Sequence, residues 1–297
     1  MIARRMLSSS IKAVFATAFF VSPAYAQSVS APAAQTVSEA CAATPPFDEA
    51  AMRPYIERVL TPGPQITPAA IPPDTMAKLM ALQKEAAARQ AKDWANLCRY
   101  AADNAKLRDN REPLRAVFLG DSITEYWRQG DPAFFSNIVQ NRGISGQTTA
   151  QMVLRFYPDV VALKPRVVHI MAGTNDVAGN LGVVSDDTIV ANLIAMLDMA
   201  RANRIVVALA SIPPARFLSW KPGLTPAPRI AALNLRLKQL AEARGAVFVD
   251  YHAHLRDDRG GFQAALANDG VHPNRDGYSV MRPLAERAIA QAARKRK

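Results

Sequence analysis

The feature that most constrains this fold is an alternation that begins at Pro113, where short apolar runs are followed by longer amphipathic segments. Apolar runs of about 4–8 residues are typical of buried strands, and longer amphipathic segments are typical of helices. Strands that alternate with helices form a parallel sheet with right-handed crossovers. The sequence therefore predicts an α/β fold, a three-layer α/β/α sandwich around a five-stranded parallel sheet. We expect strands at 116–119, 138–141, 167–171, 205–210 and 246–249, and helices near 148–163, 187–202, 229–243 and 276–293.

The first 26 residues are typical of a secretory signal peptide. A basic start containing Arg4, Arg5 and Lys12 precedes an apolar stretch at 13–21, and a small-x-small site predicts cleavage after Ala26. The apolar stretch is too short to span a bilayer as a helix. An uncleaved membrane anchor is the alternative interpretation. We expect a periplasmic or secreted protein with no stable membrane insertion.

Residues 27–110 differ from the rest and predict an N-terminal extension that is rich in proline and helical. Eight prolines between positions 45 and 73 disfavour a long helix there. Apolar residues then recur at helical spacing from Met76 to about Ala102, which predicts one helix. The extension would precede an α/β domain at 111–293 and a basic tail at 294–297.

The two cysteines, Cys41 and Cys98, are the only ones in the chain. Both follow the predicted cleavage site, and an isolated pair in an oxidising compartment is most simply a disulfide. Two buried free thiols are the alternative. The chain lacks the CxxC pairs of a structural zinc site, and we expect no metal.

The chain has a formal net charge of +11, which at first suggests a nucleic-acid partner. Three of these charges lie in the predicted signal peptide and four in the tail at 294–297. The remaining +4 is spread over the folded body without a predicted basic face. We therefore expect no nucleic-acid partner.

Four polar segments follow predicted strands, where ligands bind in open parallel sheets. They are GDS at 120–122, NRGISGQTT at 141–149, GTND at 173–176 and DGVHPN at 269–274. Taken singly, each has an ordinary alternative, namely a helix-capping serine, a glycine turn, an Asx turn and a capping Asp with a structural His. Together they supply a hydroxyl, donors for an oxyanion, and a base with its orienting carboxylate, as acyl transfer requires.

These four segments, in this order, resemble the blocks of the SGNH/GDSL hydrolase superfamily, and the resemblance covers roughly residues 113–290. It implies a flavodoxin-like fold with Ser122 as nucleophile, His272 as general base and Asp269 as the residue that orients it. The motif reads GDSI rather than GDSL, an isosteric change. The G-x-S-x-G elbow of true α/β-hydrolases is absent.

The resemblance also implies an oxyanion hole formed by the backbone N–H groups of Ser122 and Gly146 and by the Asn175 side chain. Asp121 and Asp176 would support these groups from behind. No metal or organic cofactor is implied.

The implied function is that of an exported serine esterase acting on short-chain esters, with acetyl esters of carbohydrates or other small molecules as the expected substrates. Three alternatives stay open: a lipase or lysophospholipase, an O-acyltransferase acting on envelope glycans, and a non-catalytic glycan-binding protein.

Outside the motifs, Trp220 lies in a proline-rich loop at 213–228 and could form a pocket wall or lid. Tyr126 and Trp127 could line a pocket or pack in the core, and Arg155 is expected to form a salt bridge.

Overall fold

The computed structural model describes residue 41 and residues 49–66, 71–109 and 112–295. The predicted signal peptide, its basic start and its cleavage site lie outside the described residues. Within the described ranges, no helix is both long enough and apolar enough to cross a membrane.

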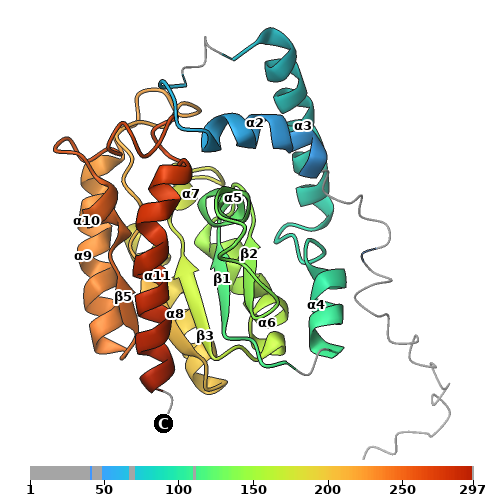
Figure 1. The fold of residues 1–297 in the computed structure, drawn as a ribbon, viewed down its shortest axis with the longest axis vertical. Coiled ribbons are helices and arrows are strands. Elements are labelled where there is room, and N and C mark those ends of the chain that lie inside the picture. The colour runs from blue at the N-terminus through green and yellow to red at the C-terminus, as the bar shows by residue number, and fades with distance from the viewer. Residues whose placement is uncertain (1–40, 42–48, 67–70, 110–111, 296–297) are drawn as a thin grey trace, which may run out of the picture. The chain divides into compact units, whose positions relative to one another are not determined.

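The centre of the molecule is a five-stranded parallel sheet, as predicted, with the strand order β2-β1-β3-β4-β5 (Figure 1). Gly120 at the end of β1 is in register with Gly143 on one neighbour and with Met171 on the other. The segments that follow these three strands therefore leave the sheet at one edge. The strands are β1 (Ala116–Gly120), β2 (Val139–Gly143), β3 (Val167–Met171), β4 (Val206–Ala210) and β5 (Val247–Val249).

Helices cover both faces of the sheet and complete three layers. One face carries α6 (Thr149–Asp159), α8 (Asp186–Ala202) and α9 (Ala227–Ala243). The other face carries α2 (Glu49–Leu60), α5 (Ser122–Gly130), α10 (Tyr251–Leu255) and α11 (Arg275–Lys295). Short elements complete the body, namely the one-turn helix α7 (Thr174–Val177) and the 3₁₀ turn η2 (Val161–Leu163).

The two cores on either side of the sheet follow from the alternation of side chains along each strand. In β1, Val117 and Leu119 are buried with α6, α8 and α9, whereas Ala116 and Phe118 are buried with α5 and α11. A strand that is apolar at every position is therefore explained by burial on both faces.

The N-terminal extension differs from the prediction because its single helix is divided. Helix α3 (Pro73–Lys92) is followed by Asp93, whose carboxylate accepts hydrogen bonds from the backbone N–H groups of Leu97 and Cys98. These bonds organise a turn in which Asn96 adopts a left-handed φ of 55°. The next helix, α4 (Ala101–Asp109), begins where the predicted helix was expected to end.

Helix α2 was not predicted, because the prolines around it suggested irregular chain. It contains Pro54, yet it runs for 12 residues. Ile56, Val59 and Leu60 are buried, so tertiary packing compensates for a poor local sequence.

Cys41 and Cys98 form a disulfide, as predicted, with their Cα atoms 5.4 Å apart.

At the other end of the chain, α11 includes Arg294 and Lys295, two residues of the predicted tail. The Lys295 Nζ donates a hydrogen bond to the Gly245 carbonyl, 3.1 Å away.

Candidate active site

Ser122 is the first residue of α5, and Asp121, between β1 and this helix, is the residue that caps it. The Asp121 carboxylate accepts a hydrogen bond from the Ile123 backbone N–H at 3.0 Å. A capping role for the serine, which the sequence left open, is therefore taken by its neighbour. The Ser122 hydroxyl is half-buried and is left available for other contacts.

Three side chains form a hydrogen-bonded row that starts at this hydroxyl. The Ser122 Oγ lies 2.9 Å from His272 Nε2, and His272 Nδ1 lies 2.7 Å from Asp269 Oδ2. An ionised carboxylate only accepts hydrogen bonds, so Nδ1 carries the proton and Nε2 is the acceptor that faces the serine. The structure thus brings together three residues, of which Ser122 and His272 are 150 positions apart in the chain.

Asp269 is held in place by its own loop. Its Oδ1 accepts the backbone N–H groups of Val271 and His272 at 2.9 and 2.8 Å. Burial raises the pKa of this carboxyl, but the charge of His272 and these hydrogen bonds outweigh burial, and the net pKa is lowered. Asp269 is therefore ionised and oriented at neutral pH.

His272 shows the complementary shift. Burial lowers the pKa of the imidazole, but the carboxylates of Asp269 and, to a smaller extent, Asp121 raise it, and the net pKa is above its usual value. The site therefore stabilises an imidazolium, the species that forms when Nε2 takes a proton. The ring of Tyr126 lies beside the imidazole with its centroid 5.0 Å away, while Trp127 packs in the core against Phe118.

The three groups predicted as oxyanion donors are the backbone N–H groups of Ser122 and Gly146 and the side-chain amide of Asn175. Gly146 has a φ of +78°, which few residues other than glycine adopt easily. Within the described residues, neither the Ser122 nor the Gly146 backbone N–H has a hydrogen-bond partner. Asn175 Nδ2 donates to the Gln147 carbonyl at 3.0 Å and to Asp121 Oδ2 at 3.2 Å. The three predicted oxyanion donors therefore lie on, or bond to, adjoining loops.

The two loops that carry these donors are connected by Asp176. Its carboxylate accepts the Thr149 N–H at 2.9 Å and the Thr149 hydroxyl at 2.6 Å. Burial raises the pKa of Asp176 and also raises that of Asp121, the latter to about 6. Both residues predicted to support the site contact its loops.

Arg155 has a larger part in the site than the sequence suggested. It forms the predicted salt bridge, to Asp159 at 2.9 Å, and is fully buried. It also donates to the carbonyls of Gly120 and Arg142 at 2.9 and 2.8 Å and to the Gln147 side chain. It thereby connects the end of β1, β2 and the Gly146 loop. The i, i+4 spacing of Arg155 and Asp159 on a helix next to a motif was the available signal.

The N-terminal extension also reaches this loop, which sequence analysis did not predict. Gln147 Nε2 donates to the Ala95 carbonyl at 2.8 Å, and Tyr100 donates its hydroxyl proton to the Gly143 carbonyl at 2.5 Å. Glu125 accepts the Ser145 backbone N–H at 2.8 Å. The segment that carries the disulfide therefore supports the chain on both sides of Gly146.

The other three histidines lie away from this row. His169 is buried in β3, with Nε2 2.9 Å from the Tyr251 hydroxyl, and burial lowers its pKa to about 3. His254 Nδ1 lies 2.8 Å from the Asp250 carbonyl, and His252 is half-buried. In the part of the chain that the structure describes, no group of three or more His, Cys, Asp or Glu is placed to hold a metal ion.

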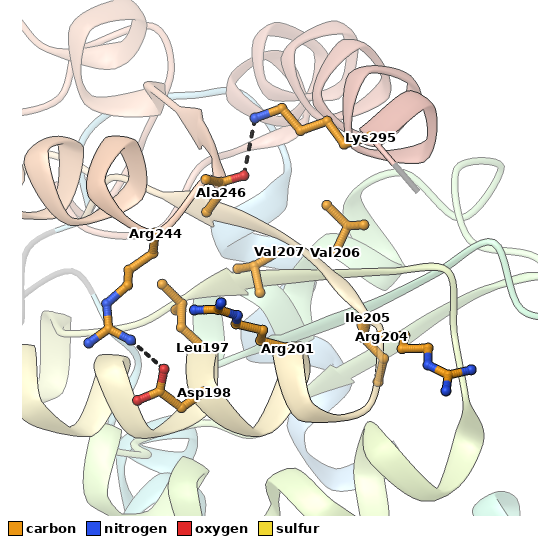
Figure 2. A pocket seen from close by; sticks show the side chains of 11 residues that line it. Leu197, Asp198, Arg201, Arg204, Ile205, Val206, Val207, Arg244, Ala246 and Lys295 are labelled. Atoms are coloured by element: carbon orange, nitrogen blue, oxygen red, sulfur yellow. Dashed lines mark hydrogen bonds and ion pairs between the residues drawn. The ribbon is translucent and has the colours of Figure 1, made fainter. Parts of the chain in front are cut away.

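A hollow of about 520 Å³ lies at the opposite end of the sheet, beside the first residues of β4 and β5 (Figure 2). Arg244 pairs there with Asp198, and Lys295 bonds to the Gly245 carbonyl. Its cations lie at or just beyond the ends of α8, α9 and α11, where positive charge is favourable next to unpaired carbonyls. None of the residues of the Ser122 row lines it, so the hollow is separate from the candidate site.

Comparisons with known proteins agree with this fold and with the order of the motifs. The chain is 27% identical to the acetylxylan esterase of Geobacillus stearothermophilus over 202 residues, which cover 56% of this chain and 90% of that enzyme. Two crystal structures resemble the fold, each covering 67% of this chain and 98% of its own. They are a candidate acylhydrolase from Bacteroides fragilis, with 42% identity and a TM-score of 0.64, and a GDSL-like lipase from Bacteroides thetaiotaomicron, with 38% identity and a TM-score of 0.63.

A family model gives the assignment. The model of the GDSL-like lipase/acylhydrolase family matches residues 118–280, more than half of the chain and all four motif segments. Fold, motif order and relatives agree. The chain therefore belongs to the GDSL-like lipase/acylhydrolase family, and it is an ester hydrolase.

Proposed function

We propose that this protein is a serine esterase in which Ser122 is the nucleophile, His272 the general base and Asp269 the residue that orients it. The observation that carries the proposal is the row from Ser122 Oγ to His272 Nε2 at 2.9 Å and from His272 Nδ1 to Asp269 Oδ2 at 2.7 Å. The first distance suits proton transfer from a nucleophile to its base, and the second suits a carboxylate that orients the base.

The reaction then has two halves. Ser122 Oγ bonds to the ester carbonyl carbon while its proton moves to His272 Nε2, and the oxyanion accepts hydrogen bonds from Ser122 N, Gly146 N and Asn175 Nδ2. The bond to the alcohol breaks as His272 returns the proton to the departing oxygen. Water, deprotonated by His272, attacks the acyl-enzyme, and the acid leaves as Ser122 regains its proton.

The first test removes the nucleophile. Ser122→Ala is expected to lower kcat for p-nitrophenyl acetate by about 10⁴-fold or more, because acyl transfer loses its covalent route. Ser279→Ala is the matched control, since this exposed serine bonds to the Asp276 carbonyl at the surface, and it should hydrolyse the ester as the wild type does. A fluorophosphonate should label the wild type and Ser279→Ala but not Ser122→Ala. Wild-type activity in Ser122→Ala would refute the mechanism.

We also propose that the natural substrate is a short-chain ester, with an acetylated carbohydrate as the leading candidate. The similarity to an acetylxylan esterase supports this choice. Nitrophenyl esters of increasing chain length should be cleaved fastest at acetate. A maximum at long chains would favour a lipase or lysophospholipase instead.

Two further alternatives give different products. An O-acyltransferase acting on envelope glycans would pass the acyl group to a sugar hydroxyl, which mass spectrometry of reactions with added oligosaccharide would detect. A non-catalytic glycan-binding protein would not react with the fluorophosphonate. We expect free acid as the product and covalent labelling.

We infer export to the periplasm or the medium. The Cys41–Cys98 disulfide supports this, since such bonds persist in oxidising compartments. The mature protein, expressed with its own first 26 residues, should begin at Gln27 when analysed by intact mass. Retention of residues 1–26 would contradict the inference.

A further inference from the structure

A chain of three side chains leads from the surface to the amide of Asn175. Trp220 Nε1 donates to Asn180 Oδ1 at 3.0 Å, and Asn180 Nδ2 donates to Asn175 Oδ1 at 2.6 Å. Trp220 is 40% exposed, Asn180 is half-buried and Asn175 is buried. The mechanism above uses only the last of the three.

The indole at the outer end sets the direction of the whole chain. An amide can rotate to exchange its donor and its acceptor, but the indole N–H can only donate. Trp220 therefore requires the oxygen of Asn180, and the Asn180 N–H₂ is left to face the next residue. That N–H₂ in turn requires the oxygen of Asn175.

At the inner end this direction places the Asn175 N–H₂ against the residues next to Ser122 and Gly146 in the sequence. Its nitrogen faces the Gln147 carbonyl and the Asp121 carboxylate, which flank Gly146 and Ser122 in the sequence. A reversed Asn175 amide would place its oxygen against two acceptors and against any developing oxyanion. Successive hydrogen bonds that run in one direction also polarise one another, so the last N–H becomes a stronger donor.

The loop between β4 and α9 holds Trp220 against the site. Phe217 in this loop lies so close to Gly270 that a Cβ there would be 2.9 Å from a ring atom, and Gly270 follows Asp269 directly. Lys221 Nζ donates to the Gly179 carbonyl at 3.4 Å, next to Asn180. The loop is therefore docked beside both the Asp269 segment and the Asn180 turn.

We propose that Asn180 and Trp220 are positioning residues for the oxyanion hole, which hold the Asn175 amide with its N–H₂ toward the reacting carbonyl. The proposal rests on the esterase function above. It predicts that changes at these two residues act on the rate through Asn175, without weakening the fold.

Two conservative substitutions test it. Asn180→Asp keeps the shape and can still accept the indole N–H, but a carboxylate cannot donate to Asn175 Oδ1. Trp220→Phe keeps an aromatic ring and removes the N–H. For p-nitrophenyl acetate, we expect kcat to fall by about 10-fold or more in Asn180→Asp and by a smaller factor in Trp220→Phe, with KM little changed, since a whole oxyanion donor is worth about 10²–10³.

Two controls match these changes. Asn203→Asp makes the same chemical change at an exposed amide that bonds to the Met199 carbonyl on α8. Leu224→Ala shortens another partly exposed side chain of the Trp220 loop. Both should retain the wild-type kcat, and thermal melting should show that all four variants are folded.

A double-mutant cycle separates positioning from a general structural role. In an Asn175→Ala background the amide to be positioned is gone, so Asn180→Asp and Trp220→Phe should produce no further loss of kcat. Equal losses with and without Asn175, or wild-type kcat in both single variants, would overturn the proposal. If Asn180→Asp fails to fold, the same double-mutant cycle is measured with Trp220→Phe and Asn175→Ala. Wild-type activity in Ser122→Ala would refute the esterase mechanism and, with it, the positioning role. If Ser122→Ala is inactive but Trp220→Phe and Asn180→Asp keep the wild-type kcat, only the positioning role is refuted.

Discussion

The two loops that carry Gly146 and Asn175, two of the proposed oxyanion donors, are supported in different ways. The Gly146 loop rests on a buried network in which Arg155 and Tyr100 bond to the backbone carbonyls of Gly120, Arg142 and Gly143. The Asn175 amide is held at its oxygen by a single row of side chains that ends at a half-exposed indole. One support is dense, charged and buried, and the other is linear, neutral and open to solvent at its end.

The kind of donor explains this difference. Gly146 would donate from its backbone, which can move only if the chain moves, so its support must hold the path of the chain. Asn175 would donate from a side chain on a buried turn, so its support has only to select one orientation of an amide. We therefore expect damage to the first support to lower stability, and damage to the second to lower rate.

Arg155→Met should have the largest effect. It leaves Asp159 buried without its cation and the Gly120 carbonyl without this donor, and breaking one partner of a buried pair destabilises by about 3–5 kcal/mol. Urea unfolding measures the loss, with the exposed Arg201→Met as control. A loss below about 1 kcal/mol would show that the network contributes little, since ordinary surface changes stay within about 0.5 kcal/mol.

Among changes to the support of the Gly146 loop, removal of the disulfide should have the next largest effect on stability. Cys41 and Cys98 are 57 residues apart, and cross-links of this kind typically contribute about 2–4 kcal/mol by restricting the unfolded chain. Cys41→Ser/Cys98→Ser should therefore melt at a lower temperature. The folded double variant should keep its kcat at 25 °C, because Gln147 and Tyr100 still bond to their partners. A large loss of kcat in folded protein would mean that the cross-link itself shapes the Gly146 loop.

Local sequence patterns predicted that Ser122 and Asn175 lie at one edge of the sheet, but not the contacts that support them. Ser122 and Asn175 each lie within a few residues of the end of an apolar run, and the carboxyl ends of parallel strands share one edge, so their meeting could be predicted without a structure. The bond from Gln147 to the Ala95 carbonyl spans 52 positions and that from Trp220 to Asn180 spans 40, and no periodicity encodes either. The division of the predicted helix after Lys92 did have a local signal in Asp93, a residue that commonly caps turns.

Tyr100→Phe should have a smaller effect on the Gly146 side. It removes the hydroxyl that donates to the Gly143 carbonyl but keeps the ring, over which Arg142 lies 4.7 Å from the centroid. One such hydrogen bond is worth about 1 kcal/mol, which urea unfolding can measure. Tyr157→Phe makes the same change at a tyrosine that is 64% exposed and should be neutral. Equal free energies of unfolding in the two variants would show that the Tyr100 hydroxyl does not stabilise the Gly146 loop.

The smallest expected effect is a shift in the pH dependence of kcat/KM. A change at Asp121, which contacts Asn175, should produce it, and a change at Tyr100 should not. Asp121, which accepts from Asn175, contributes to the raised pKa of His272. The base must be neutral to accept the Ser122 proton, so kcat/KM should fall as the pH drops through that raised pKa.

Asp121→Asn keeps a good helix cap but removes the negative charge, which lowers the pKa of His272. The acidic limb of kcat/KM should therefore move to lower pH by a fraction of a unit, while Tyr100→Phe leaves it in place. Since Asp121 itself has a pKa of about 6, the wild type should lose this influence as Asp121 protonates, which makes its acidic limb shallower than that of the variant. An acidic limb that stays in place or moves to higher pH in Asp121→Asn would contradict the prediction that the charge of Asp121 raises the pKa of His272.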